Sequence, residues 1–96
     1  MRAGRWIAAG IPGPELDSTT RERLVALAPS GIVLFARNVG DPQQLRQLTD
    51  ELHALPSQPL VAMDQEGGRV ARLKPPFTRF PPALAVGATD DVALAE

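Results

Sequence analysis

The sequence lacks cysteine and contains a single histidine, His53. Without cysteine the chain forms neither a disulfide framework nor a thiolate-ligated metal site. One histidine also excludes a metal site built from several imidazoles. We therefore expect His53 at the surface or beside a hydrophobic stripe, and we expect no metal ligands.

Long apolar runs and an excess of one charge are also missing. No stretch approaches the roughly 20 apolar residues that span a bilayer, and Trp6–Ala9 is shorter than a signal-peptide core of roughly 7–15 residues. This favours a cytoplasmic location, with a leader lost through a misassigned start codon as the alternative. Ten Lys and Arg against eleven Asp and Glu give a net charge of -1. That balance argues against nucleic acid as a partner, and the apolar pattern argues against a membrane.

The sequence instead alternates short apolar runs with amphipathic segments. The runs at 5–9, 31–35 and 59–64 predict strands. The last two are continuously apolar, which is typical of strands covered on both faces in a parallel sheet. Between the strands lie two segments with helical periodicity, at 17–28 and 41–55. The resulting order of elements is typical of a parallel α/β fold.

Each predicted helix has a recognisable beginning and an apolar face. Thr19 and Glu22 have the spacing of a capping box in the first helix, and Asp17 and Ser18 are further candidates for its N-cap. Its apolar face is predicted at Leu24, Leu27 and Ala28. In the second helix Asp41 is the expected N-cap, with proline at the first helical position. Its hydrophobic stripe is predicted at Leu45, Leu48, Leu52 and Leu55.

Beyond the third strand the pattern changes. Residues 65–82 show no periodicity and hold four of the ten prolines. Asp90 or Asp91 is expected to cap a third helix that reaches the chain end. Three parallel strands leave unpaired sheet edges, so we expect further chain to extend the sheet or to close it into a barrel.

The segment Met63–Arg72 (Met-Asp-Gln-Glu-Gly-Gly-Arg-Val-Ala-Arg) carries the chemistry. Asp64 ends a predicted buried strand, and in parallel α/β folds that end of the strand is where ligands bind. Gly67 and Gly68 permit backbone angles that are closed to other residues. Asp64 offers two acceptor oxygens that suit vicinal sugar hydroxyls, while Arg69 and Arg72 offer planar donor groups.

Three other interpretations of this segment stay open at this point. Asp64 and an arginine would form an internal ion pair that holds the loop. Alternatively, Asp64 and Glu66 would form the acid and base of glycoside hydrolysis, which paired carboxylates perform. The Gly67–Gly68 pair is also compatible with a phosphate loop, but the P-loop and dinucleotide patterns are absent.

Four motifs together carry a resemblance to a known family. They are Gly31–Asn38 (Gly-Ile-Val-Leu-Phe-Ala-Arg-Asn), Asp64–Val70 (Asp-Gln-Glu-Gly-Gly-Arg-Val), Arg72, and Phe77–Pro81 (Phe-Thr-Arg-Phe-Pro). In this order and spacing they resemble the N-terminal third of glycoside hydrolase family 3, most closely the bacterial β-N-acetylhexosaminidase branch that includes the enzyme of peptidoglycan recycling. The resemblance covers nearly the whole chain.

The resemblance implies that residues 1–96 are the incomplete N-terminal part of a barrel domain, the first three βα units of a (β/α)8 TIM barrel. It implies a retaining glycosidase that removes non-reducing terminal β-linked N-acetylglucosamine, in which Asp64 and Arg72 bind the sugar. The family's nucleophile, a later Asp, and its acid/base, a His on a later loop, belong to motifs beyond Glu96. His53 does not match that His. No residue of this chain is therefore expected to be catalytic, and the implied chemistry needs no metal or organic cofactor.

Other residues near the motifs have two possible roles. Arg37 and Asn38 follow the second strand, where they either touch substrate or, as we expect, pack a loop. Phe77 and Phe80 either face a sugar ring or wedge a loop against the barrel, and we favour the wedge. Trp6 and Phe35 are expected in the core.

Two alternatives to the hexosaminidase interpretation stay open. The first is a family member that acts on β-glucosides, because the loops that select the N-acetyl group are not among these residues. The second is a non-catalytic fragment with at most weak sugar binding. In every case the expected partner is a small carbohydrate, and the rest of the barrel is expected to be needed for folding.

Overall fold

The computed structural model describes residues 3–96, which form two compact units. The N-terminal unit ends at Met63, and the C-terminal unit runs from Asp64 to Glu96. The elements of the N-terminal unit are η1 (Ala3–Trp6), β1 (Ala8–Ala9), α1 (Ser18–Leu27), β2 (Gly31–Leu34), η2 (Ala36–Asn38), α2 (Pro42–His53) and β3 (Leu60–Met63). Those of the C-terminal unit are β4 (Gln65–Gly67), β5 (Val70–Ala71), α3 (Ala83–Ala88) and α4 (Val92–Ala95).

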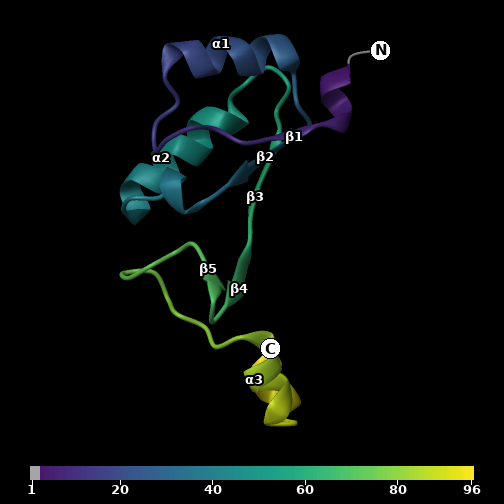
Figure 1. Ribbon diagram of the computed structural model, residues 1–96, viewed down its shortest axis with the longest axis vertical. Coiled ribbons are helices and arrows are strands. Elements are labelled where there is room, and N and C mark those ends of the chain that lie inside the picture. The colour runs from purple at the N-terminus through teal and green to yellow at the C-terminus, as the bar shows by residue number, and fades with distance from the viewer. Residues whose placement is uncertain (1–2) are drawn as a thin grey trace. The chain divides into compact units, whose positions relative to one another are not determined.

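A parallel three-stranded sheet organises the N-terminal unit, with β2 between β1 and β3 (Figure 1). Gly31 of β2 pairs with Ala8 on one side and with Leu60 on the other, and Leu34 pairs with Met63. Helix α1 connects β1 to β2, and α2 connects β2 to β3, as parallel strands require. The predicted parallel α/β order is confirmed.

The core of this unit is a single hydrophobic cluster built on β2 and α2. Ile32 and Leu34 are buried on β2, while Gly31 and Val33 on its other face are half-buried. The predicted leucine stripe of α2 is confirmed, and it packs into the same cluster. The fully buried members are Ile11, Leu24, Ile32, Leu34, Leu48, Leu52 and Leu55.

The beginning of α2 follows its predicted capping pattern. The Asp41 Oδ1 accepts a hydrogen bond from the Gln44 N–H at 2.8 Å, and Pro42 occupies the first helical position. The Gln44 side chain also reaches back, because its Oε1 accepts from the Gly40 N–H at 2.6 Å. Two free N–H groups at this helix end are thus satisfied. His53 ends the helix at the surface, as expected.

Helix α1 confirms Asp17, one of its N-cap candidates, and departs from the other predictions made for it. The capping box of Thr19 and Glu22 is wrong, because the Asp17 carboxylate accepts from the Thr20 N–H at 2.7 Å and the helix begins at Ser18. The predicted apolar face is only partly correct. Leu24 is buried, but Leu27 is exposed, and Ala28 ends the helix in the left-handed region with φ of 52°.

The predicted first strand, 5–9, is wrong in most of its length. Residues Ala3–Trp6 form a 3-10 turn, which the Ile7 N–H closes on the Gly4 carbonyl at 2.9 Å, and only Ala8 and Ala9 pair with β2. The indole of Trp6 is 75% exposed, so its core assignment is also wrong. The buried Gly4 explains the turn, since its backbone lies against the carbonyls that end α1.

The third strand forms where predicted, but it is not buried on both faces. Leu60 is 79% exposed and Ala62 is exposed, while Val61 and Met63 pack against the core. Successive side chains of a strand point to opposite faces, and within the N-terminal unit only the face of Val61 and Met63 packs on the hydrophobic cluster.

The C-terminal unit contains three elements that the sequence did not indicate, two strands and one helix. Residues 65–71, expected to lack an element, form the antiparallel β4–β5 hairpin, and α3 precedes the predicted last helix. Asp91 caps that last helix, α4, by accepting from the Ala93 N–H at 3.0 Å. Among residues 3–96, no helix has the length and apolar character needed to cross a bilayer.

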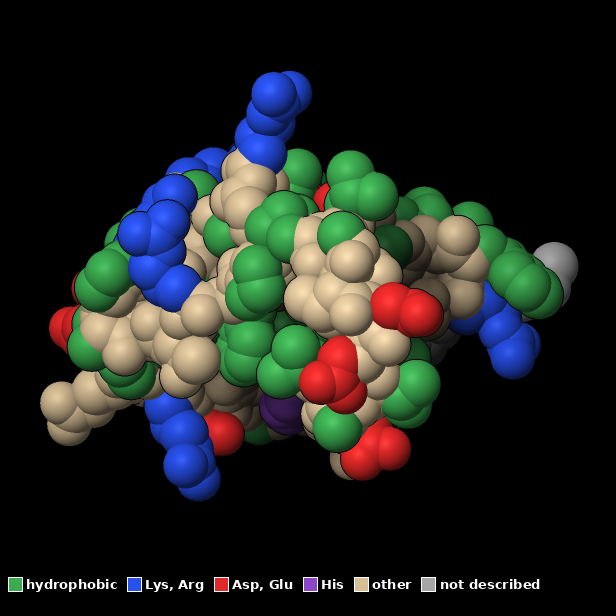
Figure 2. All heavy atoms as spheres, turned by 90° about the horizontal axis from the view of Figure 1, so that it is seen from below, with side chains coloured by type: hydrophobic (Ala, Val, Ile, Leu, Met, Phe, Trp, Pro, Cys, Tyr) green, Lys and Arg blue, Asp and Glu red, His purple; other side chains and the backbone are tan. Residues whose placement is uncertain are grey.

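Large apolar side chains lie at the surface of the C-terminal unit. Leu84 is 85% exposed on α3, and Val92 and Leu94 of α4 are also mostly exposed. Figure 2 shows many hydrophobic side chains, coloured green, on the face that it presents. Of the described residues of this unit only Gly67 is buried, so the unit has no hydrophobic core of its own.

Candidate functional site

Two polar residues, Arg37 and Asn38, follow β2 at the carboxyl end of the sheet, where ligands of parallel α/β folds bind. Asn38 is completely buried. Its Nδ2 donates to the carbonyls of Ile11 at 3.1 Å and Gly13 at 2.7 Å, and its Oδ1 accepts from the Phe35 N–H at 2.8 Å. Both polar atoms of this side chain are therefore used: Nδ2 joins the loop after β2 to the loop after β1, and Oδ1 fixes the loop after β2 internally.

Arg37 takes part in the same junction. Its Nε donates to the Ile11 carbonyl at 3.0 Å, and its guanidinium carbon lies 4.9 Å from the centroid of the half-buried Phe35 ring. A guanidinium over an aromatic face is a favourable cation–π arrangement. The structure thus places Arg37 and Asn38 in loop packing, the role that we expected for both. The core assignment of Phe35 is wrong, because its half-buried ring packs under Arg37 and does not join the hydrophobic cluster.

The candidate site in the C-terminal unit is the β4–β5 hairpin, which begins directly after Asp64. Gln65 pairs with Ala71 and Gly67 with Val70, and the register shift between the two pairs bulges the strand at Glu66. Gly67 and Gly68 have φ of 84° and 59°. These angles lie in the left-handed region that favours glycine, so the predicted use of both glycines to turn the chain is confirmed.

A second constraint acts on Gly67. A Cβ at this position would collide with the Pro81 carbonyl oxygen and would lie 2.9 Å from that of Phe80. The Gly68 N–H donates to the same Phe80 carbonyl at 3.3 Å. The backbone of residues 80–81 therefore packs directly on the turn, and only glycine leaves room for that approach.

Gln65 is a residue of the candidate site that sequence reasoning missed. Its Oε1 accepts from the Arg72 N–H at 2.8 Å and from the Leu73 N–H at 3.1 Å. One side chain thus pairs with two consecutive amides just beyond the end of β5. No signal in the sequence indicated this, because a glutamine between two carboxylates has no distinctive spacing.

Arg72 lies half-buried at the end of the hairpin, and its Nε is a buried donor without a hydrogen-bond partner among residues 3–96. Asp64 is exposed. Within the same residues the single ion pair joins Arg46 to Asp50 at 3.9 Å on the surface of α2. The interpretation of an Asp64–arginine ion pair that holds the loop is therefore wrong for this structure, because Gln65 and the packing on Gly67 hold it.

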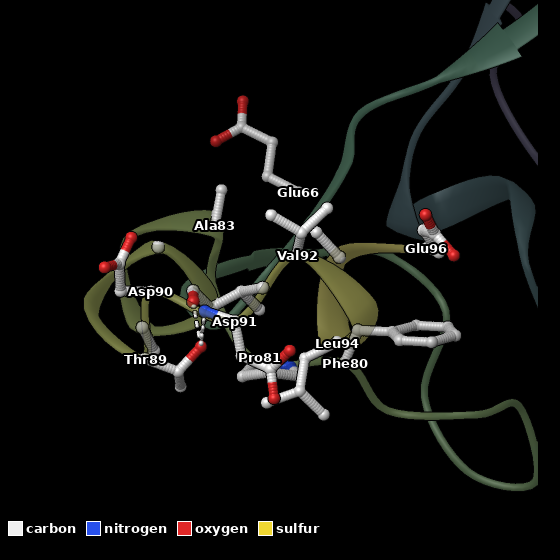
Figure 3. A pocket seen from close by; sticks show the side chains of 14 residues that line it. Glu66, Phe80, Pro81, Ala83, Thr89, Asp90, Asp91, Val92, Leu94 and Glu96 are labelled. Atoms are coloured by element: carbon white, nitrogen blue, oxygen red, sulfur yellow. Dashed lines mark hydrogen bonds between the residues drawn. The ribbon is translucent and has the colours of Figure 1, made fainter.

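Glu66 is one of the residues that line an open hollow of about 990 Å³ in the C-terminal unit, together with residues of α3 and α4 (Figure 3). Apolar side chains such as Val92 and Leu94 line much of it. Figure 3 also shows the Asp91 N–H bonded to the Thr89 hydroxyl, which fixes the turn between the two helices. The acid/base pairing of Glu66 with Asp64 stays a hypothesis.

The aromatic residues of the Phe77–Pro81 motif differ from one another. Phe77 is half-buried, whereas the Phe80 ring is 65% exposed and lines the hollow beside Pro81. The predicted wedge is thus wrong for the Phe80 side chain. Its backbone carbonyl, rather than its ring, makes the contact with the glycine turn.

No group of three or more His, Cys, Asp or Glu side chains within residues 3–96 is placed to hold a metal ion. Beside the exposed Glu66 and Arg69 of the hairpin, the segment offers the exposed carboxylate of Asp64 and the half-buried Arg72, whose backbone N–H is held by Gln65. This combination of acceptor and donor suits hydroxyl and carbonyl groups of a neutral polar ligand.

Comparison with known proteins assigns the chain to a family. Residues 7–96 match the family described as "Glycosyl hydrolase family 3 N terminal domain". The β-hexosaminidase of Nitrosomonas eutropha is 48% identical over 82 residues, which are 84% of this chain and 24% of that protein. The β-hexosaminidase of Thiobacillus denitrificans is 46% identical over 79 residues, 81% of this chain and 22% of that protein. The chain thus spans about a quarter of the length of these curated relatives.

Solved structures agree with the sequence comparison. The chain superposes with a TM-score of 0.88 on a glycoside hydrolase family 3 β-N-acetylglucosaminidase from a Paenibacillus species, at 33% identity over 98% of this chain and 19% of that one. NagZ from Neisseria gonorrhoeae, solved in complex with N-trifluoroacetyl-D-glucosamine, gives a TM-score of 0.82 at 35% identity over 92% of this chain and 27% of that one. With its parallel strands and connecting helices as part of a TIM barrel, the chain belongs to the N-terminal domain of glycosyl hydrolase family 3.

Proposed function

We propose that this chain supplies the sugar-holding segment of a β-N-acetylhexosaminidase, in which Asp64 and Arg72 bind the non-reducing N-acetylglucosamine. The observation that carries the proposal is the state of Arg72. Its backbone is anchored and its Nε is buried without a partner among residues 3–96. A buried donor that bonds nothing costs about 1–3 kcal/mol, so such a group is one that a ligand stabilises.

Asp64 complements Arg72 in this role. Its carboxylate is exposed and is joined to no arginine among residues 3–96, so both of its oxygens are free to accept from sugar hydroxyls. Carboxylate and guanidinium bonds to a ligand are charge-assisted and are about twice as strong as neutral ones. The two residues therefore offer binding free energy without forming a bond to the sugar.

The reaction of the intact enzyme follows from its class. A retaining glycosidase uses one carboxylate as nucleophile and a second group as acid and base, through a glycosyl-enzyme intermediate. In our proposal both groups come from outside residues 1–96. Asp64 and Arg72 fix the terminal sugar so that its anomeric carbon meets the nucleophile, and binding free energy from this remote part of the substrate lowers the barrier.

The choice of sugar rests on the relatives. The curated relatives are named β-hexosaminidases, and a superposing structure holds an N-acylated glucosamine derivative. These observations favour N-acetylglucosamine over a β-glucoside. Fragments of peptidoglycan, which present such a sugar at their ends, are the natural substrate class in this proposal.

The test uses a chimeric enzyme in which residues 1–96 replace the matching quarter of the Nitrosomonas eutropha β-hexosaminidase. We expect the unsubstituted chimera to hydrolyse a chromogenic N-acetylglucosaminide. Asp64→Ala and Arg72→Ala should each lower kcat/KM by roughly ten- to hundred-fold, because each loses a charged hydrogen bond of about 1.5–3 kcal/mol. The double variant should lose less than the sum, since both groups hold one ligand.

The matched controls are Asp50→Ala and Arg46→Ala, which remove the same two residue types from an exposed pair on α2. Exposed pairs contribute little to stability, so both controls should keep their kcat/KM. The melting temperature of every variant is measured beside its kinetics. An Asp64→Ala enzyme that melts early but binds N-acetylglucosamine normally would overturn the proposal, as would a folded chimera without activity.

A further inference from the structure

The Gln65 side chain extends the hairpin beyond the point where its strands stop pairing. Backbone pairing ends at Gln65 and Ala71, and β5 is only two residues long. The next two amides, of Arg72 and Leu73, both donate to the Gln65 Oε1. The Gln65 side chain thus supplies the hydrogen-bond acceptor that a partner strand would otherwise offer to the amides of Arg72 and Leu73.

This arrangement fixes the main chain from which the Arg72 side chain departs. An arginine side chain loses rotamer entropy when it is held in one geometry, so a fixed backbone at its base favours ligand binding. A hairpin two pairs long does not by itself hold the residue after it, because isolated short hairpins are marginally stable. The bond from Gln65 therefore removes freedom from the backbone of Arg72, although Gln65 itself offers no charge to a ligand.

A merely structural role would be served equally well by a contact elsewhere in the loop. The loop already has such a contact, since the Gly68 N–H bonds to the Phe80 carbonyl and the backbone at Pro81 packs on Gly67. Those contacts fix the turn of the hairpin at Gly67 and Gly68. The hydrogen bonds of Gln65 lie at the open end of the hairpin, beside Arg72, and they are not needed to hold the turn.

We propose that Gln65 is a positioning residue for sugar binding, acting by holding the backbone of Arg72 through its Oε1. This inference rests on the proposed function, because it presumes that Arg72 binds the sugar. Gln65 is not a catalytic residue, since it touches the Arg72 and Leu73 amides and not the substrate. Loss of the Gln65 acceptor should leave the charge of the site unchanged, but it should let the Arg72 guanidinium move away from the position in which it meets the sugar.

The experiment compares Gln65→Met with Gln65→Glu in the chimeric enzyme. Methionine keeps the length of the side chain but loses the carbonyl acceptor, whereas glutamate keeps an acceptor at the same reach. We expect Gln65→Met to raise KM, and the Kd of N-acetylglucosamine measured by calorimetry, by about tenfold with a smaller change in kcat. Gln65→Glu should raise KM and Kd much less, because glutamate still offers an acceptor to the two amides.

The matched control is Gln44→Met in the N-terminal unit. The Gln44 side chain also bridges backbone groups, accepting from Gly40 and donating to the Pro14 and Asn38 carbonyls. Its loss should lower the melting temperature and leave KM unchanged. If Gln65→Met behaves in the same way, with a lower melting temperature and normal kinetics, Gln65 is structural and the inference is overturned.

A double-mutant cycle separates this inference from the proposed function. If Gln65 acts through Arg72, the methionine substitution should have little further effect on KM in the Arg72→Ala background. A full tenfold effect there would overturn the inference. If Arg72→Ala alone leaves KM unchanged, the proposed function fails, whereas a raised KM in Arg72→Ala with a normal KM in Gln65→Met defeats the positioning role alone.

A second variant covers the case in which Gln65→Met does not fold. Gln65→Asn, which draws the acceptor back by one methylene, then replaces it, and failure of both variants to fold also overturns the inference.

Discussion

The two units of the chain are stabilised in different ways. The N-terminal unit buries a cluster of seven aliphatic side chains from its sheet, helices and loops. The described residues of the C-terminal unit bury only a glycine, and short hairpin pairs, the Asp91 cap of α4 and the bridge from Gln65 hold them. The proposed sugar-binding residues lie in the unit without a core.

This difference separates two physical requirements, stability in the N-terminal unit and the precise placement of side chains in the C-terminal unit. Aliphatic burial contributes about 25 cal/mol per Å² and has no direction, so it suits the sheet and its helices. A binding residue must instead be held at one position, which directional hydrogen bonds and special backbone angles achieve. The hairpin uses both, through Gln65 and through the two glycines at positive φ.

The largest effect is expected when residues 1–96 are assayed alone. The isolated chain should show no turnover of a chromogenic N-acetylglucosaminide, although the chimeric enzyme hydrolyses it. The reason is that in our proposal the C-terminal unit supplies only sugar-binding groups, while the nucleophile and the acid/base come from outside residues 1–96. The comparison is with a heat-denatured sample of the same chain. Turnover above that sample would give Asp64 or Glu66 a catalytic role.

The next prediction compares the same substitution in the two units of the 96-residue chain. Leu52 is completely buried, so Leu52→Ala should lower the free energy of unfolding by about 2–5 kcal/mol. Leu84 is 85% exposed, so Leu84→Ala should change it by at most about 0.5 kcal/mol. Urea unfolding followed by circular dichroism, at a concentration where the chain is monomeric, measures both.

Two outcomes would break this contrast between the units. Equal losses for the two variants would mean that Leu84 is packed as firmly as Leu52. The absence of any cooperative transition in the unsubstituted chain would mean that the N-terminal cluster does not suffice for folding. That second result would agree with the expectation from the sequence that the rest of the barrel is needed.

Much of the N-terminal unit could be predicted from the sequence because its signals are local or periodic. The cap at Asp41, the leucine stripe of α2 and the apolar run of β2 each follow from side-chain chemistry within one element. Predictions failed where a distant contact decided the result. The turn at Ala3–Trp6 depends on the close approach of Gly4 to the end of α1, and the exposure of Leu60 depends on which face of β3 packs on the hydrophobic cluster.

The site shows the same division. The two glycines of the hairpin turn could be predicted, because positive φ is a property of the residue itself. The bridge from Gln65 to Arg72 and Leu73 could not, since it depends on the register of two short strands and on the bulge at Glu66. For the same reason the alternative of an Asp64–arginine ion pair could be weighed from the sequence but not decided.

The smallest expected effect concerns two aspartates that cap helices, one in each unit. Asp17 caps the ten-residue α1 and accepts from the Thr20 N–H at 2.7 Å, and Asp91 caps the four-residue α4. The backbone hydrogen bond from Thr20 lowers the pKa of the Asp17 carboxyl below its ordinary value, with a further contribution from the Thr20 side chain. A carboxyl with a lowered folded-state pKa stabilises the fold above its unfolded-state pKa, and this contribution is lost as the pH falls through the folded-state pKa.

The cap of α1 should therefore weaken on acidification below about pH 4, the ordinary range of an aspartate. An NMR titration of the Asp17 carboxyl carbon should give a midpoint below that range, and the Thr20 amide should shift with the same midpoint. Asp17→Asn keeps an acceptor at the cap and should remove the pH dependence of the Thr20 shift, while Asp91→Asn should leave it unchanged. A Thr20 amide that does not follow the Asp17 titration would show that this cap does not form. Helix α1 would then begin without a side-chain cap, and Asp41 of α2 would remain as the side-chain helix cap of the N-terminal unit, to be compared with Asp91 of the C-terminal unit.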